Sequence, residues 1–175
     1  MNYTESLAYL DSLGKFGIKL GMERIEGLLR ELGNPEQKIK TVHVTGTNGK
    51  GSVTSMITNI LLAANLKVGK FTSPHLVKYN ERINLNGKDI SDEDFATAIT
   101  AVKVAADSVV KKGVCEQPTQ FEILTAAAFL YFYLQKVDYA VIEVGMGGLW
   151  DSTNVITPVV SVITNVALDH TDRCG

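Results

Sequence analysis

Apolar residues along this chain alternate between short continuous runs and stretches with the period of a helix. Residues 41–45 and 68–71 predict two strands, and the continuous apolar runs at 139–142 and 159–164 are typical of strands buried on both faces of a parallel sheet. Residues 52–64 predict a helix, because their apolar positions form one stripe: Val53, Met56, Ile57, Ile60 and Leu61. The main part of the chain therefore begins as strand, Gly-rich turn, helix and strand.

The N-terminal segment, residues 1–40, predicts two short helices that pack on the main domain. The second helix has four apolar residues at helical spacing, Ile25, Leu28, Leu29 and Leu32. It is expected to end at Gly33-Asn34-Pro35, which cannot continue a helix. We therefore expect N-terminal helices over 1–40 and a main domain over 41–175.

Turn and cap residues organise the middle of the chain. Asn86-Gly87 predicts a tight hairpin within residues 83–88, because both residue types accept the positive φ of a two-residue turn. Two capping-box patterns predict the starts of two further helices: Ser91 with Asp94, and Thr119 with Glu122. Strands that alternate with helices predict an α/β fold with a doubly wound, mostly parallel sheet. Because the sheet would stop a few residues after its latest strand, we expect this domain to be truncated.

The composition is that of a globular domain with a sizeable core, since 45% of the 175 residues are hydrophobic and 21% are charged. The net charge of −2 arises from mixed signs without a basic block, so we expect no nucleic-acid partner. Cys115 and Cys174 lack metal-ligand spacing, which favours a reducing, cytoplasmic setting. The N-terminus has neither a basic start nor a long apolar run, so we expect no membrane partner.

A Gly-rich segment joins the first strand of the main domain to the helix that follows. Its glycines allow backbone N–H groups to turn toward an anion, and a helix start favours negative charge. Lys50 adds a charge for the β- and γ-phosphates, and Ser52 supplies a hydroxyl for the phosphates or their Mg²⁺. The segment departs from the standard phosphate loop, because Val44 replaces its first glycine and Gly51 follows the lysine. A turn that binds nothing is the alternative, but the flanking elements favour an ATP site.

Four segments carry motifs that occur together, in this order, in one enzyme family. They are residues 46–52, then 72–76 with 79–83, then 141–148 with 151–156, and finally 164–170. The chain resembles the folylpolyglutamate and dihydrofolate synthases, relatives of the Mur cell-wall ligases. The extra Gly51 between Lys50 and Ser52 favours the folate branch, because Mur enzymes usually have a hydroxyl residue directly after the lysine.

The resemblance implies a role for each matching position. Mg²⁺ is expected at Ser73, Glu143 and His170, and the expected catalytic residues are Lys50, Glu143 and His170. The ATP-binding positions are expected to be Thr47, Asn48, Gly49, Lys50, Gly51 and Ser52. The positions expected on the folate side are Leu20, Arg82, Thr119, Gln120, Phe121 and Glu122. The residue types support the metal site in part, because a carboxylate at the carboxyl end of a strand suits Mg²⁺. For two of the folate positions they leave an alternative, since Phe121 also fits a core position and Glu122 also fits a helix cap.

The reaction implied by the resemblance is attack of a folate γ-carboxylate on the γ-phosphate of ATP, followed by attack of the glutamate amine on the acyl phosphate. ATP, a reduced folate and L-glutamate are the expected partners of a monomer, with Mg²⁺ as cofactor. Because the family's carbamylated lysine and C-terminal domain would lie beyond Gly175, we expect this chain to be inactive alone. The alternatives are a Mur-type ligase for a nucleotide-linked cell-wall precursor and a non-catalytic nucleotide-binding module.

Overall fold

A computed structural model of the protein describes residues 1–14 and 21–168. Within those residues, six strands form one sheet in the order β4-β3-β2-β5-β1-β6. Their bounds are Thr41–Thr45 (β1), Val68–Phe71 (β2), Ile83–Leu85 (β3), Lys88–Asp89 (β4), Tyr139–Glu143 (β5) and Val160–Ile163 (β6). The strands β2, β5, β1 and β6 run parallel, whereas at one edge β3 pairs antiparallel with β2 and β4 pairs antiparallel with β3. The prediction of a mostly parallel sheet is confirmed.

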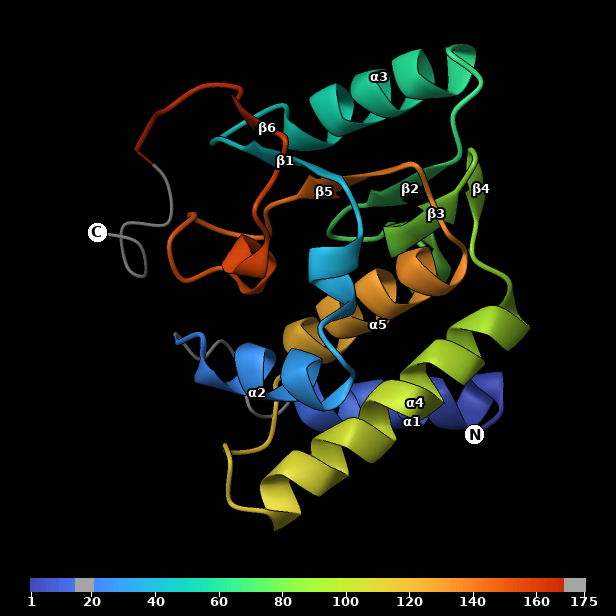
Figure 1. Ribbon diagram of the computed structural model, residues 1–175, viewed down its shortest axis with the longest axis vertical. Helices are drawn as coiled ribbons and strands as arrows, with labels where there is room; N and C mark the ends of the chain where they lie inside the picture. Colours follow the sequence, from blue (N-terminus) through green and yellow to red (C-terminus); the bar gives the residue numbers. More distant parts are fainter. Residues whose placement is uncertain (15–20, 169–175) are drawn as a thin grey trace.

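Helices cover both faces of this sheet. The long helices are Tyr3–Leu13 (α1), Glu23–Glu31 (α2), Lys50–Ala63 (α3), Asp92–Lys111 (α4) and Gln120–Leu134 (α5), and the short 3-10 helices are Pro35–Lys38 (η2), Tyr79–Arg82 (η3) and Ser152–Val155 (η4). Figure 1 shows α3 on one face and α5 on the other, with α4, α1 and α2 beyond α5. The doubly wound α/β fold is therefore confirmed. Among the described helices, none has the length and apolarity needed to cross a membrane.

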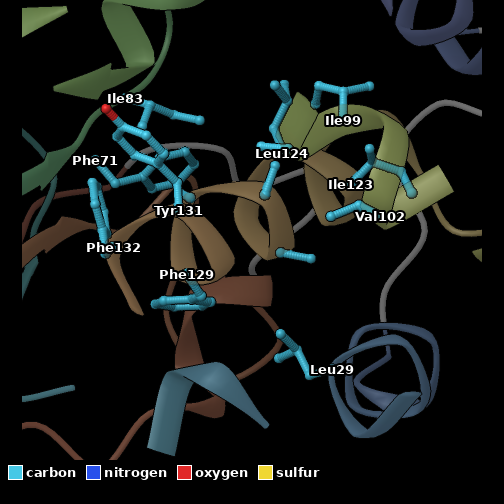
Figure 2. Packing of buried hydrophobic residues seen from close by; sticks show 14 of the residues in the cluster. Leu29, Phe71, Ile83, Ile99, Val102, Ile123, Leu124, Phe129, Tyr131 and Phe132 are labelled. Carbon is cyan, nitrogen blue, oxygen red and sulfur yellow. The ribbon is translucent and has the colours of Figure 1, made fainter. Parts of the chain in front are cut away.

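The larger hydrophobic core lies between the sheet and the helices on the α5 side. Helix α5 is buried on two sides, because it is sandwiched between the sheet and α4. The Phe132 ring packs over Gly69 of β2, and Figure 2 shows the Tyr131 hydroxyl beside Ile83 of β3 and Ile123 toward Val102 of α4. This double contact explains why α5 has no polar face, since a helix enclosed by protein all round needs none.

The predicted turn and caps are present. Asn86 and Gly87 have φ values of 51° and 80°, which gives the two-residue hairpin between β3 and β4. The Ser91 hydroxyl accepts a hydrogen bond from the Asp94 N–H at the start of α4. A complete capping box joins Thr119 and Glu122 at the start of α5. These short sequence patterns placed both helix starts correctly.

The apolar stripe predicted on α3 is partly wrong. Met56 and Ile60 are 63% and 69% exposed, although the helix itself is confirmed. Val53, Ile57 and Leu61 do pack against the buried valines of the sheet, but the buried residues of the helix are Thr54 and Thr58, so the buried face lies to one side of the predicted stripe. The Thr58 hydroxyl donates to the Thr54 carbonyl 2.8 Å away, whereas the buried Thr54 hydroxyl has no hydrogen-bond partner among the described residues.

Gly69 of β2 is a position where the core has no room for a side chain. An ideal Cβ there would lie 2.6 Å from Cδ1 of the fully buried Phe132 ring. We expect Gly69→Ala to lower the free energy of unfolding by about 1–3 kcal/mol, because an overpacked core forces the ring from its preferred position. Urea denaturation measures this effect.

A matched control for Gly69→Ala is Gly14→Ala at the end of α1. Nothing lies within 4 Å of an ideal Cβ at Gly14, and its φ of −56° suits any residue. Gly14→Ala should leave the unfolding midpoint unchanged or slightly raised. Equal losses in the two variants would contradict the steric explanation for Gly69.

Candidate nucleotide and metal site

The carboxyl ends of β1 and β5 lie side by side and their connections diverge. The chain leaves β1 toward α3 on one face of the sheet, and it leaves β5 toward η4, which contacts α5 and α2 on the other face (Figure 1). In open α/β sheets, ligands bind in the crevice that such a divergence creates. The register pairs Val44 with Glu143, so the carboxylate of Glu143 lies beside the start of the Gly-rich loop.

The Gly-rich loop has a backbone shape that only glycine adopts freely. Gly46 and Gly49 have φ values of 137° and 80°. An ideal Cβ at Gly46 would lie 2.0 Å from Oγ1 of Thr164, so even alanine could not fit there. Helix α3 begins directly after Gly49, and this places a helix N-terminus at the crevice.

A segment after β6 secures the outer side of this loop. The carbonyl of Asn165 accepts from the Thr47 N–H at 3.1 Å, and its side-chain oxygen accepts from the Asn48 N–H at 2.9 Å. The Thr164 hydroxyl donates to the Asn48 carbonyl at 2.7 Å. Sequence reasoning missed these roles of Thr164 and Asn165. The feature of the sequence that could have revealed them is a pair of polar residues directly after a predicted strand of the same parallel sheet.

These bonds determine which N–H groups of the loop remain for a ligand. Thr47 and Asn48 donate to Asn165, and the Val53 N–H already donates to the Gly49 carbonyl at 2.9 Å. The first N–H groups of a helix have no intrahelical acceptor, so those of residues 50–52 point out of the N-terminus of α3. The Lys50 ammonium lies 2.8 Å from the Gly46 carbonyl oxygen, directly over the loop. The loop therefore presents donors and a positive charge to an anion.

Glu143 faces this helix N-terminus from the end of β5. It is only 5% exposed, and its Oε2 accepts from the Ser73 N–H at 3.1 Å. A Cβ at Gly51 would lie 3.5 Å from Oε1 of Glu143, so the carboxylate touches the first turn of α3. Burial raises the pKa of Glu143, although the Ser73 N–H and the charges of Lys50 and Lys70 oppose that shift.

The donor atoms at this position suit Mg²⁺. The Glu143 carboxylate and the Ser73 residue bring hard oxygen atoms next to the Gly-rich loop, and Mg²⁺ in nucleotide sites takes one or two such ligands besides phosphate oxygens and water. In residues 1–14 and 21–168, no three His, Cys, Asp or Glu side chains gather into a metal site. His170, the third predicted ligand, lies outside the described residues.

The raised pKa of Glu143 predicts a pH-dependent stability difference. The folded state holds the Glu143 proton more tightly than the unfolded state, so ionising this buried carboxyl costs stability as pH rises above the ordinary value of 4.5. We expect Glu143→Gln to melt at a higher temperature than the parent at about pH 8 and at the same temperature at about pH 4.

Thermal melts of Glu143→Gln across this range should be compared with Glu26→Gln, which changes an exposed carboxylate. The control should show no such divergence between the two pH values. A lower melting temperature for Glu143→Gln at the alkaline end would refute the proposed cost of ionisation.

Two residues predicted on the folate side meet through Tyr79 of η3. The Arg82 Nε donates to Nδ1 of His75 at 2.9 Å, and its guanidinium carbon lies 5.6 Å from the centre of the Tyr79 ring. The Gln120 amide donates to the Tyr79 hydroxyl at 2.9 Å. Burial is the main cause that lowers the pKa of the Arg82 guanidinium. Leu20, another predicted folate residue, lies outside the described residues.

The other three predicted folate residues are engaged in the start of α5. Glu122 is 1% exposed and accepts from the Thr119 N–H and from Nε of Arg24, at 2.6 and 3.1 Å. The Phe121 ring centre lies 6.0 Å from that of Phe71, and the ring packs against Gly145. The folate roles of Thr119, Phe121 and Glu122 remain predictions.

The comparisons with known proteins bear on the chain as a whole. Residues 44–175 match the Mur ligase middle domain family. The chain is 46% identical over its full length to the folylpolyglutamate synthase of Lacticaseibacillus casei, covering 41% of that protein. It is 44% identical to the dihydrofolate synthase/folylpolyglutamate synthase of Bacillus subtilis strain 168, with 99% of this chain and 40% of that protein covered.

A solved structure adds a comparison of the fold. An FPGS–AMPPCP–folate complex superposes with a TM-score of 0.91 at 46% identity, with 98% of this chain and 42% of that chain covered. The chain thus spans about two fifths of the length of the curated relatives it matches. Together with the Gly-rich loop after β1 and the carboxylate at the end of β5, the match over residues 44–175 shows that this chain belongs to the Mur ligase middle domain family and is similar throughout to the folylpolyglutamate synthases.

Proposed function

We propose that the full-length protein that carries this chain is an ATP-dependent ligase. It joins L-glutamate to the γ-carboxylate of a reduced folate through an acyl-phosphate intermediate. The observation that carries this proposal is the buried Glu143 carboxylate, which lies against the first turn of α3 at the end of the phosphate loop. The names of its relatives and the AMPPCP–folate complex of a similar protein support the choice of substrates.

In this proposal the loop binds and orients the triphosphate. The free N–H groups of residues 50–52 and the Lys50 ammonium stabilise the charge that spreads over the phosphate oxygens during transfer. Glu143 and Ser73, with His170, would hold Mg²⁺, which supplies charge neutralisation at the phosphates. Ser73 on the β2–η3 connection donates to Glu143, so this connection would link the γ-phosphate to the folate side, where Arg82 and Gln120 both contact Tyr79.

The test is phosphate release by the full-length protein from magnesium-ATP, with each substrate omitted in turn. Release should require both tetrahydrofolate and L-glutamate, and the folate product should gain the mass of one glutamyl residue. Release that depends on a nucleotide-linked cell-wall precursor instead would favour the Mur-type alternative. Nucleotide binding without any turnover would favour a binding module and overturn the proposal.

A further inference from the structure

His43 lies on β1, between β5 and β6, and has no role in the site described above. Val42 and Val44 point toward α3, so the alternation along the strand directs His43 to the opposite face. There its Nε2 lies 2.8 Å from Oγ1 of Thr153 in η4, 110 residues away in sequence. His43 is 9% exposed and Thr153 is fully buried, so this is a bond inside the protein.

The direction of this hydrogen bond follows from the next one. The Thr153 hydroxyl donates to Oδ1 of Asp151 at 2.5 Å, and the same carboxylate accepts from the Thr153 N–H at 2.9 Å. An ionised carboxylate only accepts, and a hydroxyl has one proton. The Thr153 proton is therefore used toward Asp151, and the bond between His43 and Thr153 must be donated by the His43 Nε2–H.

The far end of this chain of bonds is the Gly-rich segment 145–148, which follows β5. Oδ2 of Asp151 accepts from the Met146 N–H at 2.9 Å. An ideal Cβ at Gly145 would lie 2.9 Å from the same Oδ2 and 2.6 Å from the Phe121 ring, so the segment is held tightly from both sides. The segment begins two residues after Glu143, and its Gly147 carbonyl accepts from the Thr45 hydroxyl at 3.0 Å.

We propose that His43 is a positioning residue for the nucleotide site. Acting through Thr153 and Asp151, it fixes segment 145–148, and this segment in turn holds the Glu143 side chain in position at the end of β5. The activity arm of this inference rests on the proposed ligase function. The phosphate loop has its own anchors at Thr164 and Asn165, so a loss of the His43 relay should disturb turnover much more than ATP binding.

Three variants of the full-length protein test this relay. His43→Leu and Thr153→Val each remove it, and we expect each to lower kcat by about 10-fold with KM for ATP changed less than about 3-fold. His43→Gln places an amide N–H near the position of Nε2 and should retain most of the parent's kcat. Equal losses in the Gln and Leu variants, or a parental kcat in His43→Leu, would overturn the inference.

Two readouts do not depend on ligase activity. Nitrogen-15 NMR of labelled histidines should show the His43 ring protonated at Nε2, with the signal assigned by its absence in His43→Gln. The Met146 amide should exchange with solvent faster in Thr153→Val than in the parent, while the Asn48 amide, anchored at Asn165, should be unchanged. If the parent lacks ligase activity but these two results hold, the proposed function fails and the relay stands. A neutral His43 protonated at Nδ1, or an unchanged Met146 amide, refutes the relay itself.

Discussion

Replacement of Lys50 by alanine in the full-length protein is expected to lower the rate of folate-dependent phosphate release by at least about 100-fold, the effect typical of losing a donor to transition-state charge. The Lys50 ammonium lies directly over the loop, 2.8 Å from the Gly46 carbonyl oxygen, and alanine leaves no cation at that position. Initial rates with saturating ATP, tetrahydrofolate and glutamate measure the effect.

The control for Lys50→Ala is Lys88→Ala, which removes an exposed lysine on β4, at the opposite sheet edge from β6. It should keep the parental rate. Calorimetric titration with magnesium-ATP separates binding from chemistry, and Lys50→Ala should weaken both. A Lys50→Ala protein that turns over normally would show that the loop does not act on the transferred phosphate.

The second large effect is expected from the buried ion pair between Arg24 and Glu122. The Arg24 Nε lies 3.1 and 3.2 Å from the two Glu122 oxygens, and the side chains are 10% and 2% exposed. Arg24→Met leaves a buried carboxylate without this partner and is expected to lower the free energy of unfolding by about 3–5 kcal/mol. Chemical denaturation measures the loss.

The ion pair between Lys103 and Asp107 on α4 gives a control, because it has a donor–acceptor distance of 2.5 Å but is accessible to solvent. Lys103→Met removes this pair. Its loss should cost less than about 1 kcal/mol, because water and salt already screen such a pair. Similar costs for the two variants would mean that burial does not set the strength of the Arg24 pair.

The sequence was sufficient for the parts of the fold that depend on local patterns. The strands of the parallel sheet, the turn at Asn86-Gly87 and the start of α5 at Thr119 all follow from hydrophobicity, turn and cap rules within a few residues. The sequence also shows Glu143 at the carboxyl end of a predicted strand, and the register of β1 and β5 puts that end beside the Gly-rich loop.

Features set by contacts between distant residues were not predictable in this way. The periodicity of α3 shows that it has an apolar side, but the neighbours that cover Thr54 decide which side is buried. The bond from His43 to Thr153 spans 110 residues and leaves no local pattern. Glu122 was recognised as a cap, but its pairing with Arg24 depends on how α2 meets α5.

The anchoring of the phosphate loop by residues after β6 has a consequence for protein synthesis. Asn48 and Asn165 are 117 residues apart, so a growing chain has made its loop long before it has made the anchor. Strand β1 also lacks both neighbours until β5 and β6 have been translated. A ligand that binds only the finished site stabilises only the finished fold. For the ATP ligand proposed above, binding can therefore stabilise the fold only after β6 has joined the sheet.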